Sequence, residues 1–113
     1  MNKFNARRTE YGGQVFDSRG EAEYARRLDA LKAAGEIRDW RRGREWVLLD
    51  GPRRADRITY RPDFEVEVGG ALRCVDFKGM LTREFRLKAK LWRHAYPDVP
   101  LYVVKADGTE RRV

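Results

Sequence analysis

The sequence predicts an α/β fold, a mixed β-sheet flanked by helices in the element order α-β-β-β-β-α-β. Two stretches, residues 18–35 and 82–96, have apolar residues at helical spacing, whereas residues 57–68 alternate apolar and polar residues as a strand does. A Gly-Gly pair at 69–70 joins that strand to a second one. The 113 residues are the length of one domain, so residues 1–113 are interpreted as a single domain whose residues 1–13, with Gly12 and Gly13, form a basic N-terminal arm or a short hairpin.

The composition narrows the class of protein. With 42% hydrophobic and 38% charged residues, the chain matches neither a membrane protein nor a disordered one. It has one cysteine, which excludes an internal disulfide, and no apolar segment follows its first basic residues, so we expect a cytoplasmic protein without a membrane partner. The formal net charge of +7 favours a polyanionic partner. Most of its cations are arginine, which suits phosphate binding and is also typical of a GC-rich genome or a heat-adapted host.

The first helix is predicted over residues 18–35, because Ser18 and Glu21 have the S-x-x-E spacing of a capping box and Gly35 follows the last apolar residues. Extended segments at 36–40 and 45–49 come next, followed by a turn-like basic loop at 50–54.

Residues 57–68 are predicted to form one half-buried strand, and residues 71–78 the strand that returns from the Gly-Gly turn. Thr82 caps a second helix that ends before Pro97, and residues 99–105 form the last strand.

The hairpin register places two carboxylates opposite each other. If Gly69 and Gly70 are the turn residues, Asp63 lies across from Asp76, and Lys78 shares the face of Asp76. Two carboxylates about 5 Å apart repel by roughly 3 kcal/mol at an effective dielectric near 20, unless a cation or a shared proton intervenes. Hard oxygen ligands beside an ammonium group suit Mg²⁺ and phosphoryl chemistry. The alternatives are an ordinary surface strand of alternating charges, or a β-bulge that shifts this register.

Glu21 supplies a candidate third carboxylate. Helical spacing places it on the same side of the first helix as Leu28 and Tyr24, which face the core. A buried acidic side chain needs a partner, so we predict that Glu21 points over the sheet toward the aspartates. Its alternative role is to complete the capping box and nothing more.

Several groups of cations are candidate phosphate contacts. They lie on the second helix, in two turns and in the N-terminal arm. A solvated amphipathic helix is the alternative for the helical group, and Lys88 lies beside the apolar side of that helix, from which it can reach toward the carboxylates. The candidates are Arg7, Arg8, Arg41, Arg42, Arg44, Arg53, Arg54, Arg83, Arg86, Lys88, Lys90 and Arg93.

The motifs resemble a known nuclease superfamily. Glu21 on the opening helix, Pro62-Asp63 and Asp76-Phe77-Lys78 resemble the active-site signature of the PD-(D/E)XK nucleases. With the segments at 5–11, 16–21, 58–64 and 75–79, the chain resembles a phage-encoded family similar to archaeal-type Holliday-junction resolvases. The sequence differs from many relatives in having Asp rather than Glu at position 76.

The resemblance implies a restriction-endonuclease-like core and a set of roles. Asp63, Asp76 and Glu21 would be metal ligands for Mg²⁺, with Mn²⁺ as a substitute, and Lys78 would orient the water or the phosphate. The activity implied is that of a homodimeric endonuclease that nicks four-way DNA junctions symmetrically, by attack of a metal-activated water on the phosphodiester. It would act in the host bacterial cytoplasm if the gene is phage-encoded.

Two other functions stay open at this point. One is a PD-(D/E)XK endonuclease with another DNA substrate, sequence-specific or associated with packaging. The other is a non-catalytic DNA-binding domain of the same fold.

Overall fold

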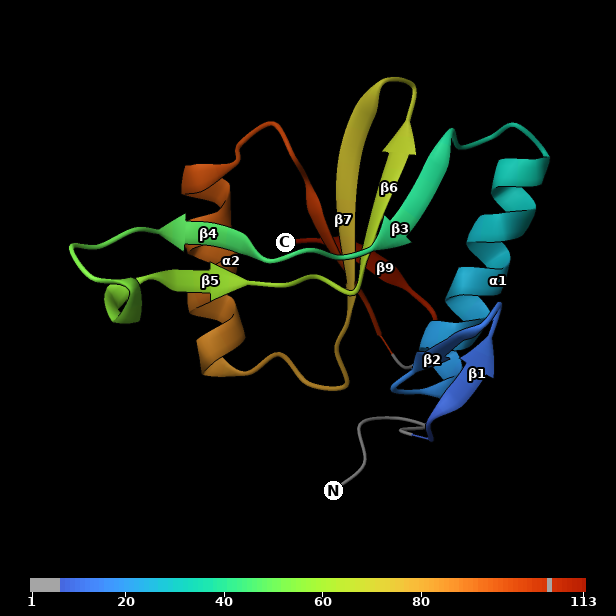
Figure 1. Ribbon diagram of the computed structural model, residues 1–113, viewed down its shortest axis with the longest axis horizontal. Coiled ribbons are helices and arrows are strands. Elements are labelled where there is room, and N and C mark those ends of the chain that lie inside the picture. The colour runs from blue at the N-terminus through green and yellow to red at the C-terminus, as the bar shows by residue number, and fades with distance from the viewer. Residues whose placement is uncertain (1–6, 106) are drawn as a thin grey trace.

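A five-stranded mixed sheet separates the two helices of the chain, as Figure 1 shows. The structure is a computed structural model, and it describes residues 7–105 and 107–113. The predicted mixed α/β class is therefore confirmed. The helices are α1 (Arg19–Ala33) and α2 (Arg83–Ala95). The strands of the sheet, in spatial order, are β3 (Asp39–Arg42), β6 (Phe64–Val68), β7 (Ala71–Phe77), β8 (Leu101–Val104) and β9 (Glu110–Arg112).

Two small antiparallel hairpins stand outside this sheet. The first pairs β1 (Thr9–Tyr11) with β2 (Gln14–Phe16), so the predicted N-terminal arm is a hairpin from residue 9 onward, while its residues 1–6 lie outside the described part. The second pairs β4 (Trp46–Leu49) with β5 (Ile58–Tyr60) and has a short 3₁₀ turn, η1 (Arg54–Asp56), at its tip.

Both predicted helix caps are confirmed. The Ser18 side chain accepts a hydrogen bond of 3.1 Å from the Glu21 amide, and the Thr82 side chain accepts one of 3.1 Å from the Phe85 amide. Each hydroxyl satisfies one amide that has no partner within its helix. Gly35, which follows α1, has a φ of +79°, the left-handed conformation that glycine tolerates at a helix C-terminus.

The predicted hairpin register is confirmed between β6 and β7. Val68 pairs with Ala71 and Phe64 with Val75, across a turn in which Gly69 and Gly70 both have positive φ. β7 then pairs with β8 in parallel, and α2 makes the crossover between them.

The single strand predicted over residues 57–68 is wrong. Residues 58–60 belong to β5, and 64–68 belong to β6 in a different sheet. Pro62, which has no amide hydrogen to donate, lies in the break, and the apolar parity continues across it, so the pattern conceals the break. The element order also gains β1 and β2 before α1, and β9 at the end.

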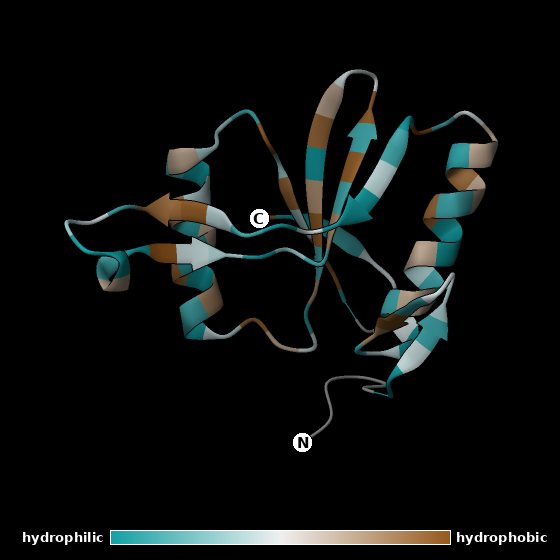
Figure 2. Ribbon diagram, in the orientation of Figure 1, coloured by the Kyte–Doolittle hydropathy of each residue, from teal (hydrophilic) through white to brown (hydrophobic). Residues whose placement is uncertain are grey.

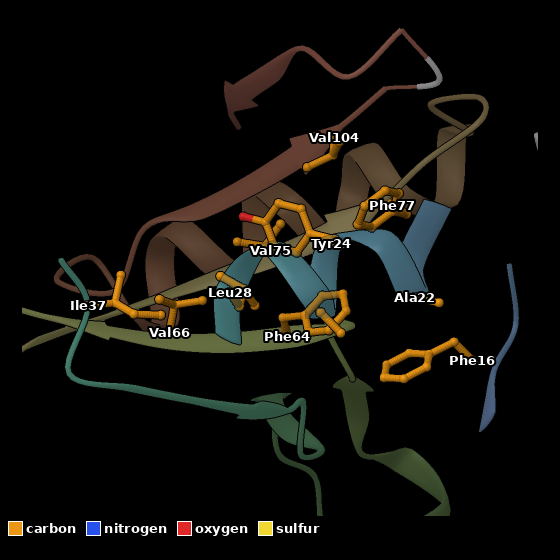
Figure 3. Packing of buried hydrophobic residues seen from close by; sticks show 11 residues of the cluster. Phe16, Ala22, Tyr24, Leu28, Ile37, Phe64, Val66, Val75, Phe77 and Val104 are labelled. Atoms are coloured by element: carbon orange, nitrogen blue, oxygen red, sulfur yellow. The ribbon is translucent and has the colours of Figure 1, made fainter. Parts of the chain in front are cut away.

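Two apolar clusters, one on each side of the sheet, form the core. Beneath α1, Figure 3 shows Tyr24 and Leu28 near sheet residues that include Phe64 and Val75. On the other side, Trp92 of α2 belongs to a second cluster, to which the β4–β5 hairpin contributes. Apolar and hydrophilic residues alternate along β6 (Figure 2).

The alternation predicts a strand with one buried and one exposed face. Because other elements cover both faces of the sheet, the first residues of β6 are buried on both sides. Phe64, Glu65 and Val66 are all buried. The hydrophilic residues that alternate with apolar ones in this part of β6 are therefore enclosed by the protein, and their polar groups need partners within it.

Gly43 lies where the chain leaves the sheet for β4, against the segment that returns from β5. Its amide donates to the Asp63 carbonyl at 3.0 Å, and a Cβ at this position would overlap the Pro62 carbonyl oxygen. We expect Gly43→Ala to lower the free energy of unfolding by about 3 kcal/mol, because rigid backbone must move to admit the methyl group. Urea denaturation measures this change.

Gly13→Ala is the matched control. Its Cβ would have no neighbour within 4 Å, so only the φ of +79° opposes the substitution. That strain is about 1–2 kcal/mol. Equal losses in the two variants would contradict the steric role of Gly43.

Candidate functional site

Asp63 and Asp76 lie in contact at one end of the hairpin. Asp76 is in β7, and Asp63 directly precedes β6. The Asp63 amide donates to Asp76 Oδ1 at 3.1 Å, and the Phe77 amide donates to Asp63 Oδ2 at 2.8 Å. The predicted juxtaposition of the two carboxyl groups is present, although Asp63 lies just outside the paired strands.

Asp76 is buried and receives two further donors. The Tyr60 hydroxyl donates to Asp76 Oδ2, and Lys78 Nζ lies 2.9 Å from the same oxygen. Burial, together with the adjacent Asp76, raises the pKa of the Tyr60 hydroxyl, so Tyr60 stays protonated and donates. Lys78 therefore lies beside the acidic pair as predicted, and Tyr60, which no motif identified, contacts the pair as well.

The Asp63 carboxyl has an unfavourable environment for a charge. Burial raises its pKa above the ordinary value, and contact with Asp76 and the charge of Glu21 raise that pKa further. The Phe77 amide opposes this shift and is the smallest contribution. Binding of a proton or of a cation would therefore reduce the repulsion between Asp63 and Asp76.

This raised pKa gives stability a predictable pH dependence. The native state binds the Asp63 proton more tightly than the unfolded chain does. Its stabilising contribution is therefore complete below the unfolded pKa of 3.8 and is lost as pH rises through the raised pKa. We expect Asp63→Asn to be more stable than the wild type at pH 8.5 in EDTA, by at least about 1 kcal/mol, since one pKa unit is about 1.4 kcal/mol. At pH 4 this advantage should vanish.

Urea denaturation at the two pH values measures both free energies of unfolding. Asp39→Asn is the control with the opposite sign, because a hydrogen bond from Lys32 lowers the pKa of Asp39. That variant should lose stability at pH 8.5 relative to pH 4. A stabilising effect of Asp63→Asn that is equal at both pH values would contradict the assignment.

Glu21 caps its helix and also reaches the acidic region. It is 2% exposed, and the Ser18 hydroxyl lies 3.3 Å from its Oε2. A cavity of about 370 Å³ is lined by Glu21 and Asp63 together, so capping and a place beside the acidic pair coexist in Glu21. The same cavity is lined by Asp17, Arg42, Gly43 and Arg61. Of these, the motifs predicted only Arg42 as a functional residue.

The residues present fit a hard divalent cation in part. Carboxylate oxygens of Asp63 and Asp76 are the donors that Mg²⁺ prefers, and Mg²⁺ commonly takes one or two protein carboxylates and retains waters. Over the described ranges, 7–105 and 107–113, no group of three or more His, Cys, Asp or Glu side chains is arranged to hold a metal ion. The predicted set of three ligands is thus represented by the two aspartates, with Glu21 beside Asp63 in the cavity.

Comparison with known families gives one match. A family model described as "Protein of unknown function (DUF1064)" matches residues 1–109, nearly the whole chain. The chain belongs to the DUF1064 family. No curated protein and no solved structure matches it. All four predicted catalytic residues of this DUF1064 chain, Glu21, Asp63, Asp76 and Lys78, lie within the matched range.

Several cations predicted to contact phosphate have acidic or polar partners within the DUF1064 chain. Arg41 and Arg44 pair with Glu65, at 2.9 and 3.5 Å, and Arg53 pairs with Asp56 at 3.0 Å. Lys88, predicted to reach toward the carboxylates, lies 3.4 Å from Glu84 of its own helix. Arg42 donates to the Val15 carbonyl and to Gln14. The other candidates are exposed and take part in none of the ion pairs found between described residues, namely Arg7, Arg8, Arg54, Arg83, Arg86, Lys90 and Arg93.

Glu65 is a buried carboxylate that the motifs did not identify as important. Its side chain is 0% exposed, and its Oε2 accepts from the Arg44 amide at 2.8 Å and from Trp46 Nε1 at 3.0 Å. Arg41 Nε donates to Oε1 at 3.0 Å. Glu65 thus connects the sheet of the DUF1064 chain to the segment that leads into β4. A polar residue in an otherwise buried strand was the available signal.

No helix among the described residues is both long and apolar enough to cross a bilayer.

Proposed function

We propose that this protein is a divalent-metal-dependent DNA endonuclease of the PD-(D/E)XK type, selective for four-way junctions. The observation that carries the proposal is the contact between Asp63 and Asp76, with Lys78 Nζ 2.9 Å from Asp76 Oδ2. Two acidic groups and an ammonium at one point, in a chain of net charge +7, suit hydrolysis of a phosphodiester. A mixed sheet with a helix on each face supports the restriction-endonuclease-like core.

The four site residues would have different roles in hydrolysis. Asp63 and Asp76 would hold Mg²⁺, or Mn²⁺ in its place, and the ion when bound supplies Lewis-acid activation of water and stabilisation of phosphate charge. Lys78 places a positive charge where a phosphate oxygen gains negative charge. Glu21, which lines the same cavity as Asp63, adds negative charge that increases attraction for a cation.

Selectivity for junctions would come from shape. A homodimer would present two copies of the exposed cations in a fixed geometry, and phosphate contacts of this kind position a DNA without reading its sequence. Symmetric paired nicks in opposing arms are the product that such a dimer would generate.

The proposal is tested with three labelled substrates, a four-way junction, a splayed duplex and a linear duplex, each with Mg²⁺ or with EDTA. We expect Mg²⁺-dependent symmetric nicks in opposing junction arms. Equal cutting of the linear duplex would exclude junction selectivity and would favour an endonuclease of the same type with another DNA substrate. Absence of cutting with both Mg²⁺ and Mn²⁺ would exclude the enzyme.

The second candidate function is a non-catalytic DNA-binding domain. The contacts of Asp76 favour this function, because its carboxylate already accepts from the Asp63 amide and the Tyr60 hydroxyl and pairs with Lys78. A purely structural Asp76 would give junction binding without nicking in any divalent ion. Repulsion between two adjacent acids opposes this function, since a DNA-binding surface gains nothing from buried negative charge.

Glu21→Gln separates the cap from the cavity role. Glutamine keeps a polar side chain at the third helical position, so we expect the free energy of unfolding to change by less than about 1 kcal/mol. Because the charge beside Asp63 is lost, we expect nicking to fall about 10- to 100-fold. Thermal unfolding and a junction-nicking assay measure the two effects, and unchanged nicking would assign Glu21 to capping alone.

A further inference from the structure

A second concave region lies between α2 and the last strand, β9. It is a groove of about 330 Å³ with an apolar floor to which Phe85 and Ala89 contribute. Cationic residues from both elements border it, and the C-terminus lies near α2 in Figure 1. The cations that line it are Arg86, Lys90 and Arg93 of α2 and Arg111 and Arg112 of β9, and we call the first four of them the groove's charged border.

The strand register explains why Arg111 belongs to this groove. Arg111 lies opposite Val103 of β8, and Val103 packs in the cluster beneath α2. Residues paired across two strands share a face of the sheet, so Arg111 is on the face that α2 covers. No pattern in the sequence placed this arginine near the second helix, and it lies beyond the residues that the family model matches.

These four side chains differ from the predicted cations that are engaged within the fold. None of the ion pairs found between described residues involves any of them, whereas Arg41 and Arg53 have acidic partners. Like charges gathered without internal counter-charges repel one another, and an anionic ligand relieves that repulsion.

The spacing of the cations suits a chain of phosphates. From Arg86 to Arg93 the helix rises about 10 Å at 1.5 Å per residue. One strand of a duplex has a phosphate about every 3.4 Å along the axis, so this row spans about three nucleotide steps. A groove with a recessed apolar floor suits a linear polyanion better than a flat anionic surface such as a membrane.

The groove also adjoins the acidic pair. Phe85, which lines the groove, has its ring centroid 4.7 Å from Lys78 Nζ, and Lys78 pairs with Asp76. We infer that the groove between α2 and β9 binds the phosphates of a DNA strand that continues past Lys78 to Asp63 and Asp76. The choice of DNA rests on the proposed function, whereas binding by the groove is measured without cleavage.

The test compares two double variants that lose the same charge. The groove variant, Lys90→Gln/Arg111→Gln, removes two groove cations. The control variant, Arg26→Gln/Arg38→Gln, removes one exposed cation of α1 and one that directly precedes β3. Fluorescence anisotropy in EDTA measures the binding of a labelled four-way junction and a labelled linear duplex at several NaCl concentrations. Because all four side chains are exposed, both variants should keep the circular dichroism and melting temperature of the wild type.

We expect the groove variant to bind DNA at least 10-fold more weakly than the wild type. The slope of log affinity against log salt should fall by about 2, one unit for each phosphate contact. The control variant should lose less than 3-fold. Equal losses in the two variants, or a loss of less than 3-fold in the groove variant, would overturn the inference.

A third probe distinguishes a lipid surface from DNA. If the wild type binds phosphatidylserine vesicles more tightly than DNA, and the groove variant loses that binding, the groove is a lipid site and the inference is overturned.

The inference and the proposed function fail in distinguishable ways. A groove variant that binds and nicks like the wild type overturns the groove alone. A wild type that nicks no DNA, while the groove variant still loses DNA binding, overturns the endonuclease alone and supports the groove.

Discussion

Asp76→Asn should abolish Mg²⁺-dependent nicking, with a loss of about 1,000-fold or more, equivalent to about 4 kcal/mol of activation free energy. The substitution removes one of two charged oxygen donors at the centre of the acidic pair. The asparagine amide oxygen can take the place of Asp76 Oδ2 and accept from the Tyr60 hydroxyl, or that of Oδ1 and accept from the Asp63 amide, so one of these two hydrogen bonds persists and we expect the fold to persist. Binding of the junction in EDTA should be retained or tightened, because one negative charge near the phosphate is gone. Nicking and anisotropy assays on the same preparation measure both effects.

Asp50→Asn is the control for this loss. Asp50 lies in the exposed loop after β4 and pairs with Arg57 at 3.2 Å. Removing its charge changes the net charge of the protein by the same amount as Asp76→Asn and leaves Asp63 and Asp76 in place. It should nick at the wild-type rate. Normal cutting by Asp76→Asn would remove Asp76 from the active site and leave its role as a structural acceptor.

Glu65→Ala should lower the free energy of unfolding by about 3 kcal/mol, because it leaves buried donors without an acceptor and opens a cavity, whereas the arginine partners of Glu65 are partly exposed and contribute less. The substitution leaves the buried Trp46 Nε1 and the Arg44 amide without their acceptor and adds a cavity. Arg41 also loses its partner at 2.9 Å. Urea denaturation monitored by tryptophan fluorescence measures the change, because Trp46 reports on the affected region.

Glu67 provides a matched control on the same strand. It also pairs with Arg41, at 3.3 Å, but its side chain is 36% exposed. Surface pairs contribute about 0–1 kcal/mol, so Glu67→Ala should lose no more than that. Similar losses for Glu65→Ala and Glu67→Ala would show that burial of the Glu65 carboxylate adds nothing to stability.

The parts of the fold that sequence predicts are local. Ser18 and Thr82 cap their helices because a hydroxyl three residues before an amide can satisfy it wherever the helix packs. The β6–β7 register follows from Gly69 and Gly70, since a two-residue turn leaves one way to pair the strands. The break at Pro62 escaped prediction because the side-chain parity is unchanged across it.

In the candidate site, too, the contacts that follow from local geometry were predictable and those made by tertiary packing were not. The contact between Asp63 and Asp76 is a consequence of hairpin geometry and was therefore predictable. Tyr60 joins the pair only because the β4–β5 hairpin covers the sheet, a tertiary event that no local pattern encodes. Arg41 and Arg44 resemble surface cations in sequence, since their buried partner Glu65 is more than 20 residues away.

The chain leaves the sheet toward β4 at Gly43 and returns from β5 at Pro62 and Asp63, and these two segments are in close contact. Residues between Gly43 and Pro62 form their own two-stranded sheet, with the 3₁₀ turn η1 at its tip. Doubling the length of a flexible loop adds only about 0.6 kcal/mol of closure entropy. Insertions at this tip would therefore leave the acidic pair in place, so the loop around η1 is free to diversify while β4 and β5 keep their contacts with α2 and Asp76.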